Sequence, residues 1–255
     1  MNIVVLVKQI PDPAGPQELN ADFTLKREGK LILDESDSYG VEIALQLRET
    51  AGGGDVTLVS MAPNGETSGL RTALAMGADD AILVSDDALH GADALTTAKV
   101  LAAAIGRKQY DLVIGAVESS DGYVGIVPAM VAELLGVQSL TFAKKIDVDG
   151  DVIRIERQTE AGYDEVEGSL PALVSVTAGV VEPRYPSFKG IMAAKKKPLD
   201  QVTVADLGVS IPAFNGSEEV TEVEDAPARA AGEKIEDDGT AFERIVAFLD
   251  EQKVL

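Results

Sequence analysis

The chain has 255 residues, 45% of them hydrophobic, and it carries a formal net charge of −21. This length allows one large or two small domains with a buried core, and the hydrophobic content is that of a soluble globular protein. No run approaches the ~18 to 20 apolar residues of a membrane span, and no room for a signal peptide precedes the first strand-like segment. The negative charge argues against nucleic-acid binding. We therefore expect a cytoplasmic protein that neither binds nucleic acid nor inserts into a membrane.

Cysteine is absent and His90 is the only histidine. Without cysteine the chain can form neither disulfides nor thiolate metal sites, which is consistent with a reducing compartment. We interpret His90, in the turn-like stretch DALHGAD, as a surface residue. We expect no metal site and no catalytic residues.

The first 136 residues alternate between apolar runs and stretches with helical periodicity. Strands are predicted at residues 2–8, 56–61, 81–84 and 112–114. Helices are predicted from about residue 37, around 70–76, at 95–105 and at 124–134, each ended by a glycine. Prolines after the first strand predict a loop, and residues 23–33 alternate like a hairpin excursion. This alternation predicts an α/β protein with a doubly wound, mostly parallel sheet.

After Gly136 the pattern changes to short strands joined by tight turns. They are expected at residues 141–146, 152–158, 163–168 and 172–177, pairing antiparallel at one edge of the sheet. Beyond residue 198 the pattern of a core fades, and residues 218–238 are rich in Glu, Asp, Ala and Pro. Residues 241–249 have the pattern of a short amphipathic helix. We divide the chain into an α/β domain, 1–200, and a C-terminal arm, 201–255, which either reaches another chain or is a disordered tail.

Ligands of open parallel sheets bind beyond the C-terminal ends of the strands. The loops there are residues 10–16, 62–65 and 115–125, and the last reads GAVESSDGYVG. Glycines and backbone amides before a helix can hold a phosphate, although an ordinary turn has the same composition. The chain has neither G-x-G-x-x-G nor G-x-x-x-x-G-K-[ST], and we find no nucleophile paired with a base. The pattern indicates binding loops without catalytic groups.

Residues 181–197 read VEPRYPSFKGIMAAKKK. Two prolines and a glycine prevent one helix or strand from running through the whole segment. Its aromatic, Met and basic side chains are those of a docking surface. The alternative is a loop packed on its own domain with solvated lysines.

Four stretches in this order resemble the beta subunit of electron transfer flavoproteins. They are VLVKQIPD (5–12), RTALAMGAD (71–79), LPALVSVT (170–177) and EPRYPSFKGIMAAKKK (182–197). The resemblance covers roughly residues 1–210. It implies an adenine-nucleotide-binding, Rossmann-like fold.

The resemblance implies a redox shuttle that catalyses no bond chemistry of its own. Such a beta subunit pairs with an alpha subunit that holds most of the FAD, and it binds AMP in a structural role. Electrons come from acyl-CoA dehydrogenases and related enzymes of fatty acid beta-oxidation, and pass to electron transfer flavoprotein-quinone oxidoreductase or a similar acceptor. In this family the C-terminal arm embraces the alpha subunit.

The resemblance also assigns residues. The AMP candidates are Leu6, Met61, Gly115, Ser119, Ser120, Asp121, Gly122, Tyr123, Val124 and Gly125. We expect the phosphate at the amides around Gly122 to Val124, with Glu118 and Asp121 binding ribose hydroxyls or capping the helix. Pro11 to Pro13 are the candidates for contact with FAD.

The partner-binding candidates are Arg184, Tyr185, Phe188, Ile191, Met192, Lys195, Lys196 and Lys197. We expect Phe188 to fill a pocket on the dehydrogenase and the three lysines to steer an acidic partner surface. The chain departs from the family in two places. Its 115–125 loop is slightly short, and Gln158 stands where relatives often carry an acid.

Two other functions remain compatible with this sequence. One is an electron-bifurcating, NADH-oxidising flavoprotein with a second FAD in place of AMP. The other is a stand-alone nucleotide-binding regulator, which would be a stable monomer without flavin.

Overall fold

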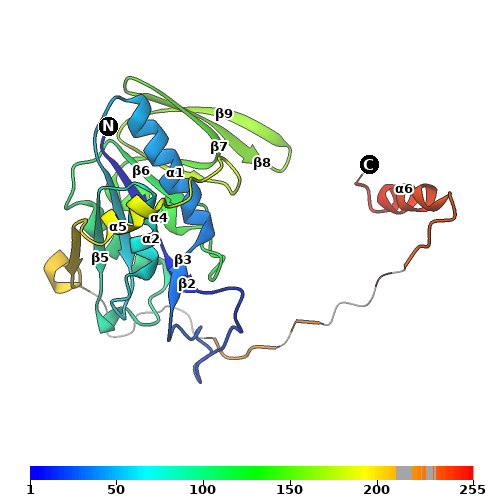
Figure 1. The fold of residues 1–255 in the computed structure, drawn as a ribbon, viewed down its shortest axis with the longest axis horizontal. Helices are drawn as coiled ribbons and strands as arrows, with labels where there is room; N and C mark the ends of the chain where they lie inside the picture. Colours follow the sequence, from blue (N-terminus) through cyan, green and yellow to red (C-terminus); the bar gives the residue numbers. More distant parts are fainter. Residues whose placement is uncertain (211–219, 225, 228–231, 233, 255) are drawn as a thin grey trace. The chain divides into compact units, whose positions relative to one another are not determined.

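The computed structural model describes residues 1–210, 220–224, 226, 227, 232 and 234–254 (Figure 1). Its contacts divide the chain into two units, Met1–Thr221 and Glu222–Leu255. Among the described residues, the larger unit contains all of the strands and the helices α1 to α5, and the smaller unit contains α6, Ala241–Glu251.

The larger unit is built on a nine-stranded sheet in the order β11-β5-β4-β1-β6-β10-β7-β8-β9. Its parallel strands are β1 (Ile3–Leu6), β4 (Val56–Met61), β5 (Asp80–Val84), β6 (Leu112–Ala116), β10 (Ala172–Val176) and β11 (Leu199–Val202). β1 lies at the centre, with Ile3 opposite Val56 of β4 and Leu112 of β6. Such strands read as continuous apolar runs because both of their faces are buried.

Helices cover both faces of the sheet. They are α1 (Glu35–Thr50), α2 (Ser68–Met76), α3 (Ala94–Ile105) and α4 (Val127–Leu135). Ile3 and Val5 of β1 pack in the core that contains α1 and α2, whereas Val4 and Leu6 pack in the core that contains α3 and α4. Successive side chains of a strand point to opposite faces, so the alternation produces two cores. The predicted doubly wound α/β fold is confirmed.

Three strands form an antiparallel ribbon at one edge of the sheet: β7 (Gln138–Asp149), β8 (Val152–Thr159) and β9 (Gly162–Ser169) (Figure 1). The antiparallel edge is as predicted, but the placement of residues 172–177 in it was wrong. β10 lies between β6 and β7 and is parallel to both. An apolar run buried on both faces does not indicate which strands will flank it, so sequence order was misleading here.

The opposite edge is formed by β11, which pairs parallel with β5. The apolar pattern fades beyond residue 198, yet the core extends past it, because Val202 and Val204 are buried. β11 reads LDQV, and an edge strand with two exposed polar side chains has no clear apolar pattern.

The excursion after β1 also differs from the prediction. β2 (Gln9–Pro11) pairs antiparallel with β3 (Leu31–Leu33), and Leu19 bridges Leu25 between them. The predicted hairpin within residues 23–33 is therefore replaced by a longer excursion that closes on the end of β1. Two short 3₁₀ helices complete the unit, η1 (Asp87–Leu89) and η2 (Ala205–Leu207).

In the smaller unit, α6 confirms the helix expected at residues 241–249. Its apolar side chains Phe242, Ile245, Val246 and Phe248 are exposed. The expectations for residues 211–219 and for most of 225–233 lie outside the described residues.

Candidate functional site

The order of the strands reverses at β1. From β1 the chain proceeds through β4 to β5 on one side, and α3 then returns it to β6 on the other side. The crevice beyond the C-terminal ends of β1 and β6 is where open α/β sheets bind ligands. Lys8 lies just after the end of β1, and the loop predicted to bind a ligand leaves the end of β6 at Val117.

Lys8 connects these two strand ends. Its Nζ donates to Ser119 Oγ at 3.0 Å and to Asp121 Oδ1 at 2.7 Å. Asp121 also pairs with Arg27 of the excursion, and its side chain is only 5% exposed. Burial alone would raise the pKa of Asp121, but the charges of Lys8 and Arg27 bring it below the usual value. The sequence predicted that Asp121 binds a ribose hydroxyl or caps the helix, but both of its oxygens are engaged by Lys8 and Arg27, and it holds the loop to the end of β1 and to the excursion.

Two buried acids at the start of α1 bind backbone N–H groups of the same loop and of Lys8. Asp34 caps α1 through Ser36 N and accepts Ser120 N at 2.7 Å with its other oxygen. Asp37 accepts Lys8 N at 2.5 Å. Burial raises the pKa of Asp37 well above its usual value, the Lys8 N–H partly opposes this rise, and the nearby Asp34 adds to it. Sequence reasoning missed Lys8, Asp34 and Asp37, although a lysine directly after a buried strand was a usable signal.

The loop's backbone donors divide into two groups. Gly122 N and Tyr123 N both donate to Ser119 O, at 3.3 and 3.0 Å, so two of the amides expected at a phosphate are already used. The next three N–H groups, those of Val124, Gly125 and Ile126, have no acceptor among the residues that the structure describes. They directly precede α4, where the helix dipole favours an anion. The expected phosphate position therefore moves to residues 124–126.

Two glycines of this loop would be crowded or strained by a side chain. A Cβ on Gly122 would lie 3.0 Å from Ser119 Oγ and 3.6 Å from Lys8 Nζ, and Gly125 has a φ of +68°. The exposed carboxylate of Glu118 lies against Gly125, where it can meet a hydroxyl better than a phosphate. Three N–H groups that precede a helix, with a lysine at the neighbouring strand end, make a donor set that fits a phosphate.

The remaining nucleotide candidates lie at neighbouring strand ends. Leu6 ends β1, Met61 ends β4, and Gly115 lies in β6, where its Cβ would meet Leu6 Cδ1 at 3.5 Å. The excursion borders the same region, because Asn64 Nδ2 donates to Arg27 O at 3.4 Å while the Arg27 side chain pairs with Asp121. The fold thus brings together the predicted loops 62–65 and 115–125.

A second candidate site is residues 181–197, which we call the recognition segment. Its residues 188–194 form the short helix α5, which Ser187 caps by accepting Gly190 N at 3.0 Å. The segment is therefore more regular than its composition suggested. Tyr185 is 91% exposed and Phe188 81% exposed, and Ile191 and Met192 are about half exposed. Lys195 and Lys196 are also exposed.

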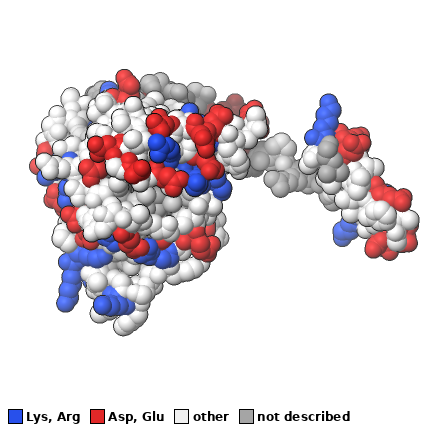
Figure 2. Space-filling view, turned by 90° about the horizontal axis from the view of Figure 1, so that it is seen from above, with Lys and Arg blue, Asp and Glu red and all other residues white. Residues whose placement is uncertain are grey.

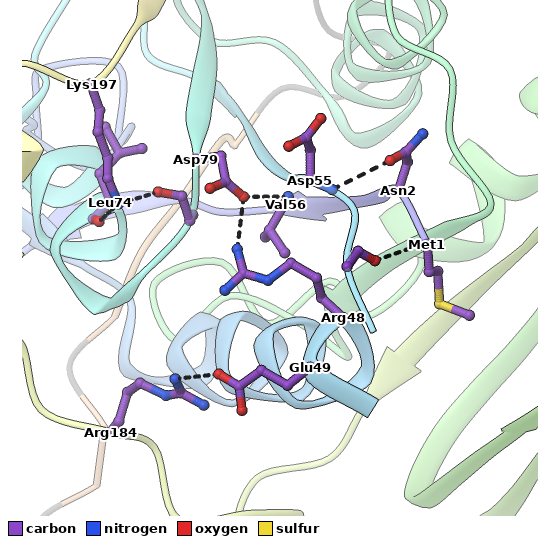
Figure 3. A network of polar contacts seen from close by, with 12 residues as sticks. Met1, Asn2, Arg48, Glu49, Asp55, Val56, Leu74, Asp79, Arg184 and Lys197 are labelled. Carbon is purple, nitrogen blue, oxygen red and sulfur yellow. Dashed lines mark hydrogen bonds and ion pairs between the residues drawn. The ribbon is translucent and has the colours of Figure 1, made fainter. Parts of the chain in front are cut away.

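Arg184 and Lys197 differ from the other candidates, since both are engaged with their own domain (Figure 3). Arg184 pairs with Glu42 and Glu49 of α1. Lys197 Nζ donates to Leu74 O at 2.9 Å and to Ala78 O at 2.6 Å, and burial lowers the pKa of Lys197. The expectation that Lys197 steers a partner therefore gives way to a structural role at the end of α2.

Acidic side chains are spread over the visible face of the larger unit, while basic ones gather in a few groups (Figure 2). Gln158 is exposed on β8 opposite Tyr163 of β9. Among the described residues, no cluster of acidic or histidine side chains could hold a metal, and none of the helices is long and apolar enough to cross a membrane.

Comparison with known proteins gives a consistent result. The family model "Electron transfer flavoprotein domain" matches residues 22–207. "Electron transfer flavoprotein subunit beta" of Mycobacterium leprae is 44% identical over 264 aligned residues, covering 100% of this chain and 99% of the relative. The protein of the same name from Thermoanaerobacterium thermosaccharolyticum is 41% identical over 82% of this chain and 81% of its own length. That of Megasphaera elsdenii is 33% identical over the whole of both chains.

Proposed function

Because this chain belongs to the electron transfer flavoproteins, as a beta subunit, we propose that it shuttles electrons as a heterodimer with an alpha subunit. The electrons come from acyl-CoA dehydrogenases and related enzymes of fatty acid beta-oxidation. They pass to electron transfer flavoprotein-quinone oxidoreductase or a similar acceptor. The heterodimer works in the cytoplasm.

The observation that carries this proposal is the exposure of Phe188 and Tyr185 on the recognition segment. Large aromatic side chains on a surface that is otherwise polar mark binding sites for proteins. Phe188 inserts into an apolar pocket of the dehydrogenase, and Ile191 and Met192 widen the contact. Lys195 and Lys196 attract an acidic partner surface, which makes association faster at low salt.

The beta subunit binds one AMP, which is structural. The N–H groups of Val124 to Ile126 and the Lys8 ammonium bind its phosphate, while Leu6 and Met61 lie beside the adenosine. FAD, held mainly by the alpha subunit, supplies the redox chemistry. Pro11 to Pro13 contribute one wall near the flavin.

Residues 201–255 act in part as an arm that binds the alpha subunit. The exposed apolar face of α6, with Phe242, Ile245 and Phe248, supports this role. Residues 199–202 form β11 of the sheet and Val204 is buried, so the arm begins after them.

Co-purification with the alpha subunit tests the proposal. Mass spectrometry of the denatured heterodimer should release one AMP and one FAD. Two FAD molecules and no AMP would assign the chain to the electron-bifurcating class instead. A stable monomer that needs neither flavin nor alpha subunit would support the nucleotide-binding regulator.

Deletion of residues 211–255 tests the arm separately. The truncated chain should keep a folded larger unit, because that unit's sheet and both cores lie within residues 1–210. Its affinity for the alpha subunit should fall. An equally tight, flavin-loaded heterodimer would show that the arm has no docking role.

A further inference from the structure

Glu42 of α1 is a buried charged contact of the recognition segment. Its side chain is 4% exposed, and its carboxylate accepts Arg184 Nε at 2.7 Å and Nη2 at 3.0 Å. It also accepts the backbone N–H of Arg184 at 3.1 Å, and Gln46 Nε2 at 2.8 Å. Burial alone would raise the pKa of Glu42, but the bonds from Arg184 bring it below the usual value, so the buried carboxylate is ionised.

Glu49 meets the same arginine differently. It accepts Arg184 Nη1 at 2.9 Å, and its side chain is 54% exposed (Figure 3). An exposed ion pair contributes little, whereas a buried carboxylate with a forked guanidinium fixes geometry strongly. The chain thus offers two glutamates on one helix, bound to one arginine, that differ mainly in burial.

The recognition segment has little apolar packing of its own. Within α5 only Ala194 is buried, and Phe188, Ile191 and Met192 face outward. Its exit is held by Lys197 at the end of α2 and by Arg71, whose Nη1 donates to Ala194 O at 2.7 Å and to Lys197 O at 3.0 Å. Its entry is held by Arg184, one residue before Tyr185. The middle of α5 packs closely on α2, where a Cβ on Gly190 would clash with Ala75 O. The polar tethers therefore fix the two ends of the segment, and its entry at Arg184 depends on Glu42.

We propose that Glu42 is a positioning residue for partner recognition. Through Arg184 it holds residues 185–192 in the conformation that the redox partner binds. Both the side chain and the backbone N–H of Arg184 are bound to one buried carboxylate, so the direction in which the chain enters the segment is fixed. A segment ordered before binding loses less conformational entropy in the complex. This inference rests on the proposed docking role of the recognition segment.

The test is Glu42→Gln in the complete heterodimer, assayed as electron acceptor of a purified acyl-CoA dehydrogenase. The KM for the flavoprotein should rise roughly tenfold, the factor that about 1.4 kcal/mol of binding free energy gives. The kcat and the visible flavin spectrum should stay unchanged. Glu49→Gln is the matched control, and its KM should change by less than about twofold because the pair that it breaks is exposed.

A double-mutant cycle with Phe188→Ala separates positioning from a general loss of stability. If Glu42 acts by placing Phe188, Glu42→Gln should add little to the loss that Phe188→Ala already causes. Effects that multiply would overturn the inference, as would an unchanged KM in well-folded Glu42→Gln protein. If that variant does not fold, Arg184→Lys provides the test, because lysine keeps the positive charge but cannot donate the two parallel hydrogen bonds of the guanidinium to Glu42. A normal KM for Phe188→Ala itself would instead refute the docking role of the segment.

Discussion

Residues 117–126, the loop that we propose binds the nucleotide and call the nucleotide loop, and the recognition segment are both held by buried acids, but they offer a ligand different things. Asp34 and Asp121 hold the nucleotide loop so that it presents backbone N–H groups. Glu42 holds the recognition segment so that it presents side chains such as Phe188. The first arrangement suits a small anion, and the second suits an apolar pocket on another protein.

This difference predicts which substitutions each region tolerates. A backbone site is damaged by any added Cβ that fills its space or forbids its φ angles. A side-chain site is damaged by truncation of the side chains that make the contact, whereas its backbone groups do not contact the ligand. Two experiments test this contrast, and two more test the buried acids that hold the nucleotide loop and Lys8.

Phe188→Ala should have the largest effect. A hot-spot aromatic loses roughly 2 to 4 kcal/mol of binding on truncation, which weakens the complex ~30- to 1,000-fold. Electron transfer from the dehydrogenase should collapse, while the flavin spectrum and the melting temperature stay nearly unchanged because Phe188 is 81% exposed. Leu95→Ala, which truncates a 45% exposed side chain on α3, should leave transfer intact. Lost FAD or a clearly lower melting temperature would make Phe188 a core residue.

Gly122→Val should reduce bound AMP without touching the recognition segment. Its Cβ would lie 3.0 Å from Ser119 Oγ, and the branch would crowd Lys8. Overpacking typically costs ~1 to 3 kcal/mol of folding stability, so the loop should shift away from this arrangement and AMP occupancy should fall. AMP per heterodimer, measured after denaturation, reports the loss, and assembly with the alpha subunit should weaken with it.

Gly106→Val is the matched control, because Gly106 has a φ of −59° and a Cβ there would make ordinary contacts at 3.5 Å. Its AMP content should be that of the unmodified protein. Full AMP occupancy in Gly122→Val would exclude the phosphate from this cradle.

Asp121→Asn should destabilise the larger unit by about 1 to 3 kcal/mol, the cost of a lost charged hydrogen-bond partner. The pKa of Asp121 is lowered from 3.8, so its stabilisation is present above that pH and is lost as pH falls through the lower, folded value. The difference from the unmodified protein in denaturant titrations should therefore shrink in acid. Asp147→Asn, which breaks an exposed pair with Lys145, should change little. A difference that is constant with pH would contradict the ionised Asp121.

Asp37→Asn should have the smallest effect, and of opposite sign. The pKa of Asp37 is raised from 3.8, so the unfolded chain ionises first and stability falls as pH rises from 3.8 through the folded value. Asparagine keeps an oxygen that can accept the Lys8 N–H, and because it does not ionise, it removes this loss of stability with rising pH. We expect a slightly higher free energy of unfolding at neutral pH and a flatter pH profile. A large destabilisation at neutral pH would show that Asp37 is ionised in the folded protein.

Much of the fold could be predicted from the sequence, because buried parallel strands such as β4 are apolar runs with clear ends. The position of β10 could not be predicted, because its neighbours in the sheet depend on the crossover connections. β11 could not be recognised, because the edge strand LDQV has two exposed polar residues and no continuous apolar run. The exposed residues of the recognition segment were recognisable from their types. The partners of Lys8, Asp121 and Glu42 were not, because each contact joins residues far apart in the chain.

Arg184 and Lys197 hold the two ends of a stretch whose outward side chains are exposed or half-exposed. The side chains of such a stretch can be exchanged in protein engineering while the residues that hold its ends are kept. A library varied at Tyr185, Phe188, Ile191 and Met192, with Glu42, Arg71 and both tethers kept, would change partner choice on an unchanged scaffold. Selection for transfer from a foreign dehydrogenase could then redirect electrons without redesign of the flavin site.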